Sequence, residues 1–139
     1  MAGYSGTPLI KKLGIKDNFD VAFVNAPENF VTQLELPTSV NVKRIAQSKP
    51  LDFIQVFVTT QAALTTAFAQ CPLKLKSNGM FWVSWPKKSS GVQTDLNENI
   101  VRDIGLAAGL VDVKVCAVDD VWSGLKFVYR LKDRPKLKR

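Results

Sequence analysis

The feature that most constrains the fold is the alternation of strand-like runs with helix-like segments. Runs rich in β-branched and aromatic residues occupy 19–24, 40–45, 53–58, 80–85, 111–118 and 122–131. Segments with helix-capping signals occupy 7–14, 27–34, 59–70 and 95–109. Such alternation predicts a mostly parallel sheet covered by helices on both faces. Because the last two runs follow each other directly, we expect an antiparallel strand pair at the C-terminus. The sequence therefore predicts a single α/β domain with a Rossmann-like, three-layer architecture.

Chain length and charge define the domain boundaries that we expect. A chain of 139 residues suits one cooperative core better than two cores of about half that size. We expect residues 1–131 to form the Rossmann-like domain and 132–139 to form a basic, flexible tail. Of the net charge of +7, residues 126–139 carry seven positive charges and one negative charge. Such a segment is typical of a solvated tail, or of attraction to nucleic acid or anionic lipid.

The composition excludes several kinds of chemistry. The chain has no histidine, the commonest general base and metal ligand. Cys71 and Cys116 stand far apart and form no zinc-binding or iron–sulfur motif, so we expect buried free thiols and no metal site. No signal peptide and no apolar stretch of about 20 residues is present. The expectation is a cytoplasmic protein that does not bind membranes. Whether it is an enzyme stays open, with a non-enzymatic role preferred.

The loop after the first predicted strand reads Asn25-Ala26-Pro27-Glu28-Asn29. Nucleotide-binding folds place glycines here, because backbone amides must approach phosphate or ribose closely. This loop has no glycine, and no dinucleotide or P-loop motif occurs elsewhere. We therefore expect no NAD, FAD or P-loop nucleotide, and no cofactor at all.

The segment after the fourth predicted strand combines an aromatic residue, two lysines, two serines and a glycine within residues 85–91. Alternation places Trp82 and Ser84 on one sheet face and Trp85 on the other. One hypothesis is an anion-binding pocket in which an aromatic ring stacks on the ligand, ammonium groups supply charge and hydroxyls donate hydrogen bonds. The alternative is a stiff turn with solvated lysines. The candidate residues are Trp85, Lys87, Lys88, Ser89, Ser90 and Gly91, joined by Tyr4 and Ser5 if the N-terminus folds over this surface rather than packing at the sheet edge.

The pair Asp119-Asp120 signals a hairpin turn more strongly than a metal site. Lys114, in the preceding strand, is a candidate ion-pair partner for one of these acids. A turn is also predicted at 77–79, and Asp95 is predicted to begin a capping box for the last helix.

Three motifs resemble a family of short bacterial proteins of unknown function: YSGTPLIKKLGIK at 4–16, WPKKSSG at 85–91 and KVCAVDDVWSGLK at 114–126. The resemblance implies a bacterial origin and a compact cytoplasmic domain, and it supplies no activity. More distantly, the order of elements is similar to class I S-adenosylmethionine-dependent methyltransferases. Those enzymes carry a glycine-rich loop after the first strand and an acid after the second, and neither feature is evident here.

The preferred hypothesis is a non-enzymatic domain that binds an anionic small molecule or a macromolecular partner on a degenerate methyltransferase-like scaffold. A minimal methyltransferase, or another small transferase, is the first alternative. Electrostatic binding of nucleic acid through the basic tail is the second. Nothing in the sequence predicts the oligomeric state.

Overall fold

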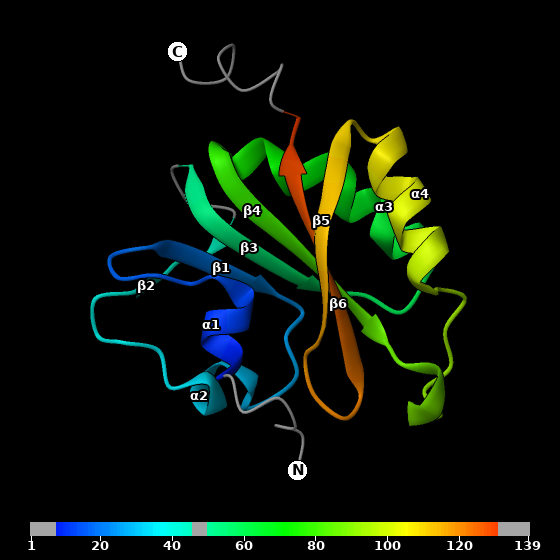
Figure 1. The fold of residues 1–139 in the computed structure, drawn as a ribbon, viewed down its shortest axis with the longest axis horizontal. Helices are drawn as coiled ribbons and strands as arrows, with labels where there is room; N and C mark the ends of the chain where they lie inside the picture. Colours follow the sequence, from blue (N-terminus) through cyan, green and yellow to red (C-terminus); the bar gives the residue numbers. More distant parts are fainter. Residues whose placement is uncertain (1–7, 46–49, 131–139) are drawn as a thin grey trace.

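The computed structural model describes residues 8–45 and 50–130, which form an α/β domain around one mixed sheet (Figure 1). The strand order is β2-β1-β3-β4-β6-β5. Strands β1 to β4 pair in parallel, and β6 runs antiparallel to both β4 and β5. The predicted α/β class, with a closing antiparallel pair, is confirmed. The strands are β1 (Asp20–Val24), β2 (Asn41–Val42), β3 (Leu51–Phe57), β4 (Leu75–Pro86), β5 (Leu110–Ala117) and β6 (Trp122–Tyr129).

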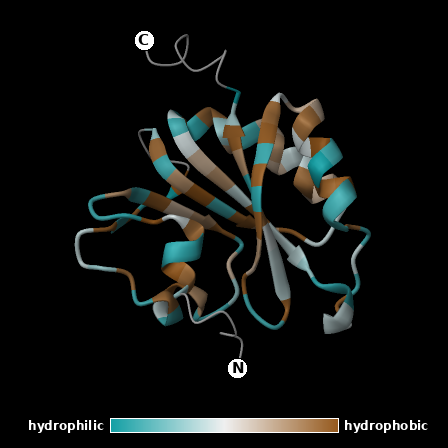
Figure 2. Ribbon diagram, in the orientation of Figure 1, coloured by the Kyte–Doolittle hydropathy of each residue, from teal (hydrophilic) through white to brown (hydrophobic). Residues whose placement is uncertain are grey.

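Helices cover both faces of the sheet, and each face has its own apolar cluster. Helices α1 and α2 lie at the lower left of Figure 1, and α3 and α4 lie at the upper right. In Figure 2 the central strands are largely hydrophobic in colour, whereas α4 carries both colours, as expected of a helix with one buried side. The helices are α1 (Leu9–Leu13), α2 (Phe30–Leu34), α3 (Gln61–Gln70) and α4 (Glu98–Ala107), with short 3₁₀ turns η2 (Pro72–Lys74) and η3 (Lys88–Ser90).

The predicted alternation along β4 is confirmed. Trp82 is fully buried in the cluster beneath α1 and α2, where its indole N–H donates to the Leu13 carbonyl at 2.9 Å. Trp85 belongs to the cluster beneath α3 and α4. Successive side chains of a strand point to opposite faces, so this strand supplies one tryptophan to each half of the core.

The turn predicted at 77–79 is wrong, because these residues lie within β4. The register between β3 and β4 shifts there: Leu51 is opposite Leu75, whereas Phe53 is opposite Met80. A β-carbon on Gly79 would lie 2.8 Å from Cγ of Leu75, so the glycine serves a close approach inside the strand. The turn-like composition therefore marks an irregular strand.

Several predicted elements are shorter than expected. The helix predicted over 27–34 begins only at Phe30, and the strand predicted over 40–45 is confined to Asn41–Val42. Helix α1 ends as predicted at Gly14, whose φ is +83°. The predictions for Tyr4, Ser5 and the basic tail fall outside the described residues. None of the described helices is long and apolar enough to cross a membrane.

Candidate functional site

A cleft of about 500 Å³ lies where strand β4 ends and the chain turns toward helix α4. We call it the β4 cleft. In open α/β sheets ligands bind outside the carboxyl ends of the strands, and this cleft lies at that end of β4. Its lining residues are Trp85, Pro86, Lys87, Lys88, Gly91, Val92, Gln93, Thr94, Leu96, Asn97, Glu98 and Ser123.

Hydrogen bonds fix the near wall of the β4 cleft. The Lys87 N–H donates to the Val121 carbonyl at 2.7 Å, which ties the end of β4 to the turn before β6. The Ser90 N–H and hydroxyl both donate to the Lys87 carbonyl, at 3.0 and 2.6 Å. Gly91 follows with φ of +78°, a left-handed conformation that glycine adopts without steric cost. The loop is thus a closed turn that holds both lysines at the rim.

The far wall is held against the start of helix α3. The Thr94 hydroxyl donates to the Thr59 carbonyl at 2.5 Å, and Asp95 Oδ1 accepts from the Gln61 N–H at 2.8 Å. Asn97 Oδ1 accepts from the N–H of Ile100 and so caps α4. The predicted capping box beginning at Asp95 is therefore wrong. The Asp95 carboxylate serves the first residue of α3, a helix that is near in space but far away in sequence.

Positive charges outnumber negative ones among the described residues that line the β4 cleft. None of the described carboxylates forms an ion pair with Lys87 or Lys88. Glu98 is the one acid among the lining residues, and its Oε2 lies 2.6 Å from Nη2 of Arg102. Arg102 also contacts Asp112 at 2.8 Å. The rim thus carries two ammonium groups and one carboxylate that is already paired.

The structure brings together part of the predicted site. Lys87, Lys88 and Gly91 line the β4 cleft, and Trp85 lines it while being only 5% exposed. The ring of Trp85 is thus packed in the core and offers little stacking surface. Ser90 shapes the loop through its hydrogen bonds, and Ser89 is exposed but outside the lining.

Sequence reasoning missed the far wall, which is formed by Gln93, Thr94, Asn97 and Glu98 together with Ser123 of β6. The capping signal at 95–98 could have pointed to the first four, because it shows that the loop runs directly into a helix start. The contribution of Ser123 depends on the pairing of β4 with β6, where it is opposite Trp85.

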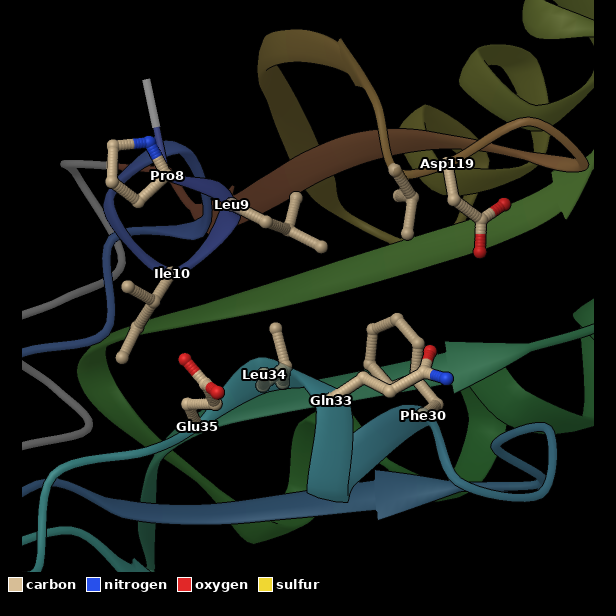
Figure 3. A pocket seen from close by; sticks show the side chains of 9 residues that line it. Pro8, Leu9, Ile10, Phe30, Gln33, Leu34, Glu35 and Asp119 are labelled. Atoms are coloured by element: carbon tan, nitrogen blue, oxygen red, sulfur yellow. The ribbon is translucent and has the colours of Figure 1, made fainter. Parts of the chain in front are cut away.

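The described start of helix α1 lines a different pocket, of about 330 Å³. Figure 3 shows Leu9 and Ile10 of α1 facing Phe30 and Leu34 of α2 across it. We call it the α1–α2 pocket. The structure thus does not bring the start of α1 to the β4 cleft. Its other lining residues are Pro8, Gln33, Glu35, Val118 and Asp119.

The hairpin interpretation of Asp119 is confirmed. Its Oδ1 accepts from the N–H groups of Val121 and Trp122, at 2.9 and 2.8 Å. Lys114 does not pair with it, because the Lys114 ammonium donates to the Lys12 carbonyl at 3.0 Å. Among the described residues, no group of three cysteine or acidic side chains is placed to hold a metal ion.

The loop after β1 turns sharply without glycine. Asn25 and Asn29 adopt φ of +59° and +70°, in the left-handed region that asparagine tolerates better than most residues. The next residue, Phe30, is 6% exposed, and its ring centroid lies 4.9 Å from that of Phe57 at the end of β3. Two exposed basic residues, Lys43 and Arg44, follow β2.

The strand order and the reversed β6 place the chain in the Rossmann-like fold of class I S-adenosylmethionine-dependent methyltransferases. One similar structure is precorrin-6y C5,15-methyltransferase from Geobacter metallireducens (TM-score 0.60, 9% identity, 88% of this chain and 86% of that chain). Another is a SAM-dependent methyltransferase from Aquifex aeolicus (TM-score 0.59, 15% identity, 86% of both chains). A third is Aeropyrum pernix fibrillarin with bound S-adenosyl-L-methionine (TM-score 0.55, 10% identity, 88% and 69%).

No protein-family model and no curated protein matches the sequence. At these identities the similarity establishes the fold, and function has to be argued from the site.

Proposed function

We propose that this chain is a ligand-binding module on a methyltransferase-type scaffold, and that the β4 cleft takes a small ligand bearing a carboxylate or phosphate group. The observation that carries the proposal is the convergence of Lys87 and Lys88, without ion pairs to the described acids, on a cleft at the carboxyl end of β4. Thr94 and Asn97 add polar groups to the wall. A few polar groups in a largely preformed cleft are typical of small-molecule sites.

The test compares Lys87→Ala/Lys88→Ala with Lys43→Ala/Lys74→Ala, a matched control that removes the same charge away from the cleft. The probes are inorganic phosphate, citrate and adenosine monophosphate at constant ionic strength. A ligand at 100 times its dissociation constant stabilises the native state by about 2.7 kcal/mol, which a thermal melt detects easily.

We expect at least one probe to raise the Tm of the parent chain and of the control. Each charge-assisted hydrogen bond contributes about 1.5–3 kcal/mol, so affinity should fall about 100-fold or more in the cleft variant. Its ligand-free Tm should stay close to the parent value, because neither lysine has an ion pair with a described acid to lose. If all probes act equally on both variants, the β4 cleft is not the anion site.

The second candidate function is that of a minimal S-adenosylmethionine-dependent methyltransferase, or another small transferase. The fold comparisons favour it, since the similar structures are methyltransferases. The residues present do not fit the usual cofactor site. Asn25 and Asn29 adopt the left-handed backbone that glycine adopts most readily, but they carry side chains where glycine leaves room, and Pro27 has no N–H to donate. Basic residues follow β2, where an acid would bind the ribose hydroxyls.

Titration calorimetry with S-adenosylmethionine and S-adenosylhomocysteine separates the two candidates. We expect no heat of binding at millimolar cofactor. Saturable binding would contradict the proposal if Lys87→Ala/Lys88→Ala left it intact and Asn25→Ala/Asn29→Ala removed it. The chain would then bind the cofactor with asparagines in place of glycines, and the methyltransferase candidate would be the better one.

A further inference from the structure

Four lysines gather beside helix α1 on the antiparallel end of the sheet. Lys114 and Lys126 are register partners across β5 and β6, so their side chains stand next to each other on one face. The Lys114 ammonium reaches the carbonyl of Lys12 in the last turn of α1. The Lys12 ammonium lies near β5 as well: burial raises the pKa of the Cys116 thiol, and the charges of Lys114 and Lys12 lower it. Lys16 follows that helix and lies close enough to lower the pKa of Lys126. We call these four residues the lysine patch.

The positive charges of the lysine patch do not help to stabilise the fold. Like charges directly opposite each other in a sheet are destabilising. Burial, then Lys114, then Lys16 lower the pKa of Lys126, and all three act in the same direction. No ion pair with a described acid offsets them. The carboxyl end of a helix carries about half a negative charge, which is too little to balance four ammonium groups.

We propose that the lysine patch binds the phosphate backbone of a nucleic acid without reading its bases. The patch is separate from the β4 cleft and shares no residue with it. Lys126 lies in the strand that leads to residues 132–139, where the sequence has five more positive charges and one acid. Backbone binding of this kind needs an array of cations, and the phosphates would relieve their mutual repulsion.

The chemistry of the surface favours nucleic acid over a membrane. Membrane-surface binding needs large apolar groups beside the charges. The exposed hydrophobic residues of β5 are two valines, Val113 and Val115, and neither is a Trp, Phe or Leu of the kind that enters a membrane surface. Val115 is opposite Leu125, which belongs to the core beneath α3 and α4, so it faces away from the patch. The large exposed hydrophobic residues that the structure describes include no aromatic ring on which a base could stack. Binding should therefore be independent of sequence.

The experiment measures the affinity of the full chain for a labelled 20-nucleotide single strand of mixed sequence, by fluorescence anisotropy across a salt series. The test variant is Lys114→Gln/Lys126→Gln. Lys16→Gln/Lys126→Gln is a second variant that keeps the hydrogen bond from Lys114 to α1. The matched control is Lys43→Gln/Lys74→Gln, which removes the same net charge elsewhere. The salt slope is the slope of the logarithm of the binding constant against the logarithm of the salt concentration. Each lost phosphate contact should lower its magnitude by about 0.7, so it should fall by about 1.4 in both test variants.

We expect weaker binding and a shallower salt slope in both patch variants and neither change in the control. The Tm of Lys16→Gln/Lys126→Gln should not fall, because like charges have been removed and the hydrogen bond from Lys114 to α1 is kept. Equal losses in the patch variants and the control would overturn the proposal, since binding would then follow net charge alone. It would also be overturned if the patch variants lost binding to phosphatidylserine vesicles but kept binding to the oligonucleotide. In that case the surface would recognise a membrane.

Discussion

The contact between helix α4 and strand β6 offers a sharp test of the packing, because two effects of one substitution have opposite signs. Gly105 lies in the last turn of α4, and within a helix alanine is favoured over glycine by about 1 kcal/mol. A β-carbon on Gly105, however, would lie 2.1 Å from Cε2 of Phe127. Phe127 is fully buried and meets the ring of Phe68 edge to face, with centroids 5.0 Å apart. The ring therefore has little room to move.

We expect Gly105→Ala to destabilise the protein. Overpacking a dense core costs about 1–3 kcal/mol, and so close an approach to a confined ring belongs at the upper end. After subtracting the gain in helix propensity, the net loss is about 2 kcal/mol. For 139 residues the unfolding entropy is about 0.3 kcal/mol/K, so the Tm should fall by about 7 °C.

The assay is thermal and urea unfolding of Gly105→Ala beside a matched pair at an exposed position of the same helix, Asp103→Ala and Asp103→Gly. That pair measures the preference for alanine over glycine in α4 without any clash. In the Phe127→Leu background, Gly105→Ala should cost less than in the parent chain, because leucine leaves space for the new methyl group. If Gly105→Ala instead raises the Tm by the margin seen at Asp103, helix α4 does not pack on β6 as described.

Three further predictions concern single side chains. Asp95→Ala removes the acceptor for the Gln61 N–H and should lower the free energy of unfolding, measured in urea, by about 1 kcal/mol. Asp95→Asn keeps an oxygen acceptor and should lower it less. Equal losses in the two variants would refute the capping role of Asp95. Burial raises the pKa of the Cys71 thiol from 9.0 to about 11. The free energy of unfolding should therefore be unaffected by this thiol below pH 9 and fall by about 2–3 kcal/mol as the pH rises to 11. The decline should be smaller in Cys71→Ala, and identical pH profiles would contradict this prediction. Asn25→Ala should lower the free energy of unfolding by about 1–2 kcal/mol and Asn25→Gly should leave it almost unchanged, because only alanine is strained at φ of +59°. Equal melting temperatures for the two variants would exclude the left-handed conformation.

The central strands and the two long helices could be predicted because their signals are local. The run 53–58 has enough β-branched and aromatic residues to define β3 whatever surrounds it. Thr60 caps α3 through its hydroxyl, which accepts from the Ala63 N–H at 3.1 Å, and the sequence places it directly before the helix. Period-two alternation likewise assigned Trp82 and Trp85 to opposite faces.

The contacts between distant segments could not be predicted, because local patterns do not encode which surfaces meet. Asp95 satisfies α3 only because the fold brings the end of one loop to the start of another helix. Lys114 meets the end of α1, which lies 102 positions earlier in the sequence. The far wall of the β4 cleft has the same origin. Sequence reasoning therefore found the rim of the cleft that carries the charge and missed the wall that closes it.

The loop after β1 shows why a missing glycine has two separate consequences. Glycine supplies both a left-handed φ and free space where a β-carbon would stand. Asn25 and Asn29 supply the first, so the chain still turns from β1 into α2 in a methyltransferase-like fold. They do not supply the second, and Phe30 follows them into the core against Phe57. Under the proposed function the scaffold persists without the space for a nucleoside, whereas the fold comparisons favour a methyltransferase. Asn25→Gly/Asn29→Gly removes both β-carbons and still allows the left-handed turn. If it gains affinity for S-adenosylmethionine over the parent chain, the β-carbons were the obstacle; if it gains none, the obstacle lies elsewhere, as in the packing of Phe30 or the absence of an acid after β2.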